Sequence, residues 1–207
     1  KTAEKFCQEQ IRGNSREEFN VLYLKFLKEI YSMQQDNQKL ATVLMQLFPE
    51  TFDFADYVFI EAQMAGEEEK KTWRSKIFAR ARGMAAYHEG ALLFSFQLLD
   101  YEEKYKKMLE LIKERTPYAL IIQYAEKMIH ADRKSFLKDL MHKPDDFHSW
   151  QDKKADQEAG SHFAELLAIL RKHYSGPEIQ WAVSNAETGS RYSRPARFVQ
   201  YVKENQG

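Results

Sequence analysis

Signals that start a helix recur about every sixteen residues along this chain, and this spacing constrains the fold more than any other feature. They lie near positions 37, 53, 68, 85 to 90, 100, 116 and 132. A helix, a short turn and a second helix, repeated, form an array in which each pair buries its apolar side against the next pair. We therefore predict an all-α fold, built as an antiparallel helix-hairpin array.

The clearest signals follow one another in the middle of the chain. Asp100 and Glu103 form a capping box, in which the Asp carboxylate accepts from a free backbone N–H and the Glu reaches back to the cap. Thr116 precedes Pro117, a residue suited to the first helical position. Asp132 is the third signal. Three short helices are expected here.

The repeat length and the composition refine the fold class. One hairpin occupies roughly 32 residues, close to the ~34 of a tetratricopeptide repeat (TPR), so a TPR-like α-solenoid of about ten short helices is expected. Eight Gly and five Pro in 207 residues leave few helix breakers. The period-two alternation of β-branched residues that indicates strands is missing. These features agree on a nearly all-helical chain.

Charge, hydropathy and cysteine content exclude several classes of protein. Lys plus Arg and Asp plus Glu are both 31, so the basic excess of a dedicated nucleic-acid binder is absent. Mean hydropathy is −0.64. No apolar run approaches the length of about 20 residues that a membrane span needs. A lone Cys7 cannot form an internal disulfide. The chain lacks a signal-peptide pattern and an initiator Met, so we expect a cytoplasmic fragment of a larger protein.

Near the N-terminus, one apolar stripe is predicted to face the core. A second capping box, Ser15 to Glu18, precedes it. The stripe falls at helical spacing and comprises Phe19, Leu22, Tyr23, Phe26, Leu27 and Ile30.

The single interruption of the helical pattern suggests the domain organisation. We predict a helical-hairpin array over 1–143, a loop or irregular linker over the polar segment 144–160, and a C-terminal helical cap over 161–207. Within the cap, Ser175-Gly176-Pro177 is predicted to stop one helix and start the next.

Two groups of residues are candidates for binding. The last forty residues or so are locally basic with interleaved aromatics, a pattern suited to polyanion contact. Its candidates are Arg171, Lys172, Arg191, Arg194 and Arg197. The second group is tyrosines that suit the concave face of an array, with core packing as the alternative: Tyr87, Tyr105 and Tyr124.

No catalytic or metal signature is present. His130, His142 and His148 lack the i, i+4 spacing and the cysteine partners of a zinc site, so no metal or cofactor is expected. Arg82 and His88 stand at the spacing of the Arg-to-His motif of HEPN-type ribonucleases. Gly83 replaces the polar residue that this motif needs beside the Arg, and the alternative is a helix end facing solvent.

The C-terminal residues resemble a known family. The run Phe163 to Tyr174, then Trp181, then Arg191-Tyr192-Ser193-Arg194-Pro195-Ala196-Arg197-Phe198 resembles the C-terminal helical end of SWIM zinc-finger proteins. The finger itself, C-x-C followed by C-x-H, is absent. The resemblance implies a helical region C-terminal to a finger, which serves as an interaction module.

Together these features predict a non-enzymatic scaffold that binds a protein partner through a helical-repeat surface, with no membrane association. The alternatives are a nucleic-acid-binding accessory module that uses the basic C-terminal patch, or a HEPN-like ribonuclease.

Overall fold

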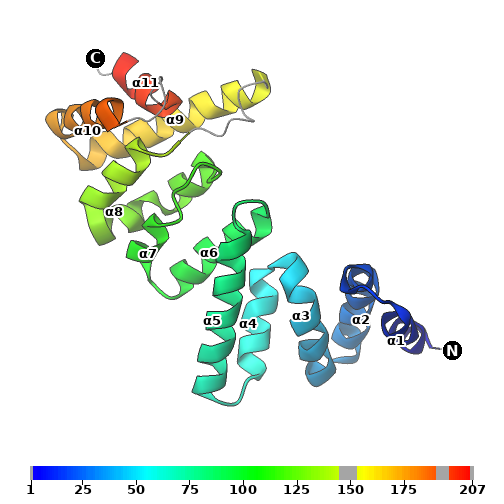
Figure 1. The fold of residues 1–207 in the computed structure, drawn as a ribbon. Helices are drawn as coiled ribbons and strands as arrows, with labels where there is room; N and C mark the ends of the chain where they lie inside the picture. The colour runs from blue at the N-terminus through cyan, green and yellow to red at the C-terminus, as the bar shows by residue number, and fades with distance from the viewer. Residues whose placement is uncertain (1, 145–152, 190–195, 206–207) are drawn as a thin grey trace. The chain divides into compact units, whose positions relative to one another are not determined.

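The computed structural model describes residues 2–144, 153–189 and 196–205, and within these ranges the chain is helical without strands (Figure 1). The residues fall into two compact units, Lys1–Leu98 and Leu99–Gly207. This division differs from the predicted boundaries at 143 and 161. No helix among the described residues is both long enough and apolar enough to span a bilayer.

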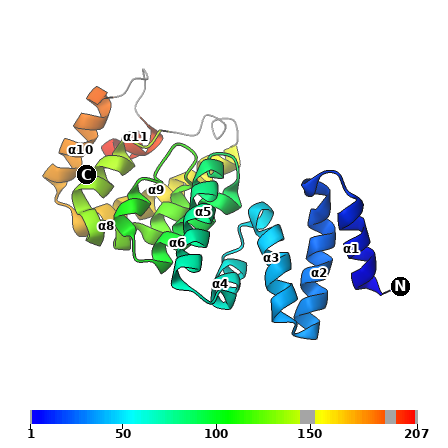
Figure 2. The same cartoon turned by 60° about the horizontal axis from the view of Figure 1, so that its bottom comes forward.

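The first unit contains α1 (Ala3–Gly13), the 3₁₀ turn η1 (Glu17–Asn20), α2 (Val21–Gln34), α3 (Asn37–Thr51), α4 (Phe54–Gln63), α5 (Glu67–Met84) and most of α6 (Glu89–Tyr101). The helices α1 to α4 each pack against the next, as both ribbon views show (Figure 2). Two predicted caps are confirmed. Asp36 accepts from the Lys39 N–H at 3.1 Å, and Asp53 accepts from the Ala55 N–H at 2.8 Å.

The core of this unit is aromatic. Phe48 is fully buried, and its ring lies 5.1 Å from that of Phe94 and 5.6 Å from that of Phe52. Gly90 lies close to this cluster, and a Cβ there would make a tight contact of 3.1 Å with the Thr51 carbonyl oxygen.

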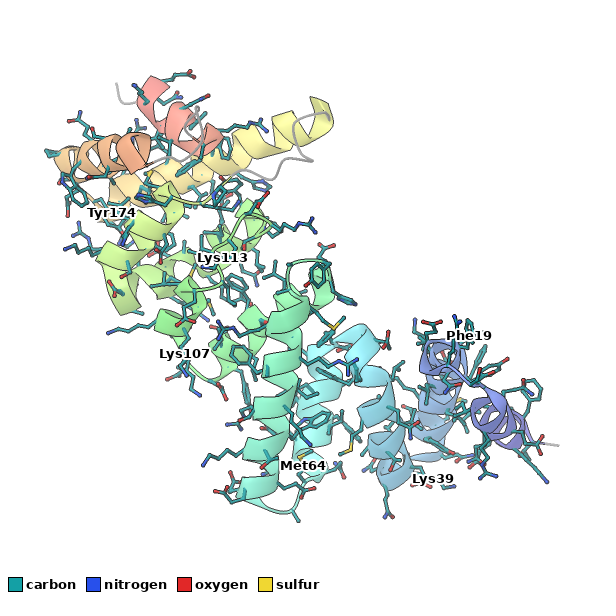
Figure 3. The ribbon with its side chains drawn as sticks, viewed as in Figure 1. Phe19, Lys39, Met64, Lys107, Lys113 and Tyr174 are labelled. Carbon is teal, nitrogen blue, oxygen red and sulfur yellow. The ribbon has the colours of Figure 1, made fainter. Side chains whose placement is uncertain are left out.

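The predicted apolar stripe of α2 forms only part of the buried face: Leu27 is buried, and Tyr23 and Ile30 are partly buried against the core. Leu22 is 58% exposed, and Phe19, labelled in Figure 3, is 56% exposed. Leu24 and Tyr31, which the predicted stripe does not include, are buried as well. The reason is tertiary: α1 and α3 pack against α2, and the Tyr31 hydroxyl donates to Glu4 at 3.0 Å.

Ser15 is not a helix cap, because η1 begins after Arg16 without a side-chain cap. The predicted capping box is therefore wrong, although the chain does turn at this point.

Buried charge joins the helices of this unit. Lys28 of α2 donates to the buried Asp56 of α4 at 2.6 Å. Arg74 of α5 donates to the buried Glu61 of α4 at 2.6 Å and to the Tyr57 hydroxyl at 3.3 Å. Burial of Tyr57 is the main reason that its pKa is raised. These contacts fix how α4 lies against its neighbours, because a buried charge without a partner is costly.

The second unit contains α7 (Tyr105–Leu109), α8 (Tyr118–Met141), α9 (Lys153–His173), α10 (Gly176–Gly189) and α11 (Arg197–Glu204). α8 is central, because it packs against α7, α9 and α10. The rings of Tyr118, Phe163 and Phe198 join α8, α9 and α11, with centroids 4.9 Å and 5.4 Å from that of Phe163.

The three start signals in the middle of the chain have different outcomes. Asp100 starts no helix: it lies in the last turn of α6, and its carboxylate accepts from Lys127 of α8 at 2.5 Å. The chain turns instead at Glu103, which has φ 54°. Thr116 precedes α8 as predicted, but its hydroxyl donates to the Leu111 carbonyl at 2.6 Å and does not cap the helix. Asp132 is a true cap and is considered below.

α9 begins inside the range 144–160 that the sequence predicts to be a loop or linker, so the backbone of 153–160 is helical. The prediction relied on polarity, but Lys, Ala, Gln and Glu in this segment are good helix formers. The break at Ser175-Gly176-Pro177 between α9 and α10 agrees with the prediction.

Candidate functional site

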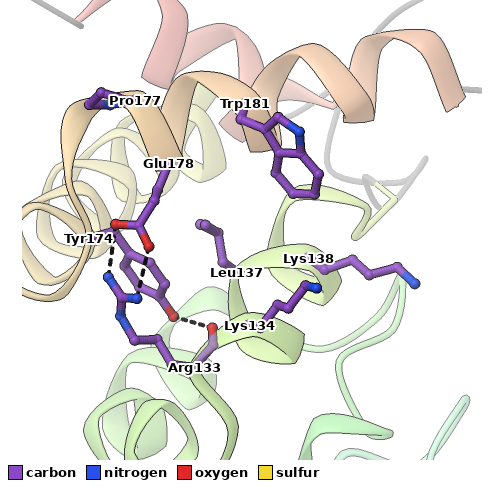
Figure 4. A pocket seen from close by; sticks show the side chains of 8 residues that line it. All are labelled: Arg133, Lys134, Leu137, Lys138, Tyr174, Pro177, Glu178 and Trp181. Atoms are coloured by element: carbon purple, nitrogen blue, oxygen red, sulfur yellow. Dashed lines mark hydrogen bonds and ion pairs between the residues drawn. The ribbon is translucent and has the colours of Figure 1, made fainter.

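An open pocket of about 410 Å³ lies between the second half of α8 and the start of α10 (Figure 4). Its size falls in the range of small-ligand and peptide-anchor sites. The residues that line it come from α8, from α10 and from the turn between α9 and α10: Arg133, Lys134, Leu137, Lys138, Tyr174, Pro177, Glu178 and Trp181. All belong to the second unit.

A break in α8 positions one wall of the pocket. The backbone of Asp132 is non-helical, with φ −159° and ψ 87°. Its carboxylate accepts from the Ser135 N–H at 3.0 Å. This makes Asp132 the N-cap of the helical segment that follows. The hydrogen bond is also the main reason that the pKa of Asp132 is lowered. After this break, Arg133, Lys134, Leu137 and Lys138 of α8 line the pocket.

Arg133 links this part of α8 to α9 and α10. Its guanidinium donates to the His173 carbonyl at 2.8 Å and 2.6 Å and pairs with Glu178 at 2.8 Å. Its charge also lies 4.5 Å from the centroid of the Tyr174 ring. The planar, five-donor guanidinium suits such a junction better than an ammonium group does.

Glu178 performs two tasks at the start of α10. It accepts from the Ser175 N–H at 2.8 Å and pairs with Arg133. The first contact is the one that the Glu of a capping box makes. Arg133 first, and then Ser175, lower the pKa of Glu178 to about 2. Glu178 is therefore ionised at neutral pH and neutralises Arg133.

Tyr174 closes the base of the pocket. Its ring is buried, and its hydroxyl donates to the Arg133 carbonyl at 2.5 Å. Burial raises the pKa of Tyr174, so the hydroxyl stays protonated at neutral pH.

The rest of the lining is apolar on one side and basic on the other. Trp181 of α10 is 62% exposed, Pro177 is also exposed, and Leu137 is buried beneath them. Lys134 and Lys138 are exposed on α8, and neither forms an ion pair with another described residue. The pocket therefore offers an apolar surface beside positive charge that no ion pair neutralises.

The functional groups of the pocket lining are cationic, apolar and hydrogen-bonding side chains. No nucleophile and base lie together among the lining residues, and Glu178, the only carboxylate there, is held by Arg133. In the described part of the chain, no group of three His, Cys, Asp or Glu side chains could hold a metal ion.

Two of the five basic residues predicted from the sequence are engaged elsewhere in the unit. Arg171 donates to the Asn205 carbonyl, and Lys172 pairs with Glu126 of α8 at 2.7 Å. Arg197 lines a separate, smaller hollow of about 220 Å³ between α9 and α11. Arg191 and Arg194 lie outside the described residues.

The predicted tyrosines belong to both units. Tyr87 is 78% exposed and belongs to the first unit. Tyr105 and Tyr124 belong to the second unit, where both rings flank Lys127, at 5.7 Å and 6.0 Å. Tyr124 is buried, so core packing, the alternative interpretation, describes it.

Arg82 and His88 also have structural contacts. The Nδ1 atom of His88 accepts from the Ala91 N–H at 3.2 Å and so caps α6, and its ring packs 5.3 Å from that of Phe52. Arg82 lies 5.8 Å from the Phe78 ring.

The sequence reasoning missed the pocket residues on α8. Lys134 and Lys138 are four residues apart, which places them on one helix face, but this spacing is common on solvated helices. Trp181 is one of the aromatics interleaved with the basic residues of the C-terminal segment. Leu137 and Lys138, which line the same pocket, lie more than forty residues earlier, where no local sequence pattern connects them to Trp181.

Searches of family models, curated proteins and solved structures each found no match to this chain.

Proposed function

We propose that this chain is a non-enzymatic protein-interaction module, a TPR-like α-solenoid of helix hairpins that binds a partner through the pocket between α8 and α10. Packing of α1 to α4, and of α7 to α9, each against the next, supports the solenoid, as do contacts that skip one helix: α8 with α10, and α9 with α11. In our proposal the module acts in the cytoplasm and corresponds to the region C-terminal to a SWIM finger, as the resemblance at its C-terminus implies.

One observation carries the proposal: the exposed indole of Trp181 over an apolar pocket. A large aromatic side chain in this position is kept in contact with water at a free-energy cost, and tryptophan is among the residues that dominate binding energy at protein interfaces. The pocket has the size and the lining of an anchor site for a side chain of a partner.

Nucleic acid is the weaker alternative. Affinity for a polyanion comes from several cations that each neutralise a phosphate. Of the basic residues proposed for this role, Arg171 and Lys172 already bind a carbonyl and a carboxylate of the same unit. Within the described residues, only Lys134 and Lys138 line the pocket as cations without an ion pair.

Selection from a phage library of random linear peptides tests the proposal. The whole 207-residue chain is the bait, and enriched peptides are measured by fluorescence anisotropy against the wild type and Trp181→Ala. Because Trp181 is mostly exposed, its removal leaves the core intact. We expect enriched peptides to lose about tenfold or more in affinity for Trp181→Ala, as for a hot-spot residue.

Phe19→Ala is the matched control, because Phe19 is a similarly exposed aromatic residue that does not line the pocket. It should leave the affinity unchanged. If no peptide is enriched, or if the enriched peptides bind Trp181→Ala as tightly as the wild type, the proposed function of this pocket is wrong.

A further inference from the structure

Some charged side chains around the pocket pair with each other, and others remain available to a partner. Arg133 and Glu178 pair at 2.8 Å, so this end of the pocket is neutral and closed. Lys134 and Lys138 are exposed on the same helix and form no ion pair with another described residue. The outward-facing charge at the pocket is therefore positive.

The spacing of these lysines defines what they fit. Four residues of an α-helix separate their Cα atoms by about 6 Å along the axis. Figure 4 shows Leu137 near Trp181 and Lys134, with the Lys138 side chain directed away from Trp181. A ligand that fills the opening meets the indole on one side and Lys134 on the other, and Lys138, which also lines the pocket, lies about one helical turn from Lys134.

We propose that the pocket binds an acidic peptide segment of a partner protein. One bulky apolar side chain of the segment inserts against Leu137 and Trp181. Two carboxylates about 6 Å apart, as at i and i+4 of a helix, pair with Lys134 and Lys138. The inference rests on the proposed function and specifies its partner.

The lining favours a peptide over a nucleic acid. Leu137 and Pro177 offer aliphatic surface, which suits an aliphatic or aromatic side chain, whereas a single-strand site needs a basic groove that follows several phosphates. Two flexible lysines also suit carboxylates in varied geometry, since an ammonium group binds as a point charge.

The composition of the enriched peptides is the first test. We expect Asp and Glu to be in excess beside one bulky apolar residue. A synthetic peptide of the enriched sequence should lose about two- to fivefold in affinity for Lys134→Glu and again for Lys138→Glu, the loss that a partly exposed ion pair of up to ~1 kcal/mol implies. The doubly substituted chain should bind a version of the peptide with Lys in place of its Glu residues more tightly than the wild type does.

Lys25→Glu is the matched control, because Lys25 is an exposed lysine of the first unit without a recorded ion pair. It should not change the affinity. Enriched peptides that depend on Trp181 but are uncharged, or that bind the doubly substituted chain as well as the wild type, overturn the acidic partner and leave the proposed function standing. Tighter binding of a single-stranded oligonucleotide than of any peptide, lost in the same double variant, overturns both.

Discussion

Replacing Phe48 by Ala tests whether the first unit is organised around its aromatic cluster. Phe48 is fully buried, and its ring lies within 6.2 Å of the rings of Phe52, Tyr57, Trp73 and Phe94. A phenylalanine buries about 150–250 Å². At about 25 cal/mol per Å² this corresponds to roughly 4–6 kcal/mol, an upper bound because the unfolded chain also buries some apolar surface.

Measured Phe→Ala substitutions in cores cost about 3–5 kcal/mol, so we expect Phe48→Ala to lower the free energy of unfolding of the first unit by about 4 kcal/mol. The tilted and edge-to-face ring pairs add a coupling of about 0.5–1.5 kcal/mol each. A double-mutant cycle of Phe48→Leu with Phe94→Leu should therefore be non-additive by about that amount.

Amide hydrogen exchange in increasing urea is the appropriate measurement, because a chain of two units need not unfold in one step. The amides of α3 should lose protection in Phe48→Ala. Leu166→Ala, at a fully buried position of α9 in the second unit, is the control and should lower protection in α9. A loss below about 1 kcal/mol at the α3 amides would show that Phe48 is not packed as described.

Three further predictions concern other parts of the chain. The pKa of Glu178 falls from 4.5 to about 2 on folding, so its stabilising contribution is complete above pH 4.5 and is lost as pH falls toward 2. The difference in thermal midpoint between the wild type and Glu178→Gln should shrink over this range, and a constant difference would contradict the pairing with Arg133. Asp132→Ala should cost about 1 kcal/mol by removing a helix cap, detected as faster exchange in the second half of α8 and not in its first half. Leu22→Gln should change the free energy of unfolding by less than about 1 kcal/mol, because Leu22 is exposed, whereas Leu27→Ala should cost about 2–5 kcal/mol. A urea titration measures both, and the reverse order would contradict the exposure of Leu22 and the burial of Leu27.

The helix starts were largely predictable from the sequence. Asp36, Asp53 and Asp132 each cap a helix, because a short carboxylate that precedes an apolar run satisfies a backbone N–H within three residues. Asp100 has the same local pattern but lies inside α6. Its neighbours Leu98 and Leu99 are almost fully buried, and packing outweighs the cap. The sequence therefore predicts helix-capping hydrogen bonds correctly where tertiary packing does not favour another arrangement.

The buried face of α2 could not be predicted in the same way. The helix has apolar residues around most of its circumference, so periodicity alone allows more than one inward face. The contacts of Tyr31 with Gln8 at 3.0 Å and Glu4 at 3.0 Å determine the choice, and both partners lie on α1, more than twenty residues away. The sequence does not indicate which polar groups meet.

The basic C-terminal patch shows the same limit for charge. A count of charged residues in the sequence includes Lys172 as a cation, but Lys172 pairs with Glu126, which lies 46 residues earlier. Hydrogen bonding to Lys172 is the main reason that the pKa of Glu126 is lowered, so the two charges compensate one another. A cluster of basic residues in a sequence predicts a binding surface only where folding leaves those residues without partners.

Arginine and lysine have different roles at the pocket, and this difference affects the affinity for a partner. The rigid guanidinium of Arg133 is used within the fold, and the outward charges are two flexible ammonium groups. Exposed pairs of this kind contribute little each and are screened by salt, so most of the affinity must come from the apolar anchor at Trp181. Binding of the acidic peptide should then weaken only modestly between low and physiological salt. A nucleic-acid site with about six or more phosphate contacts would lose roughly a thousandfold or more. Salt dependence thus separates an anchored peptide from a polyanion without knowledge of the partner.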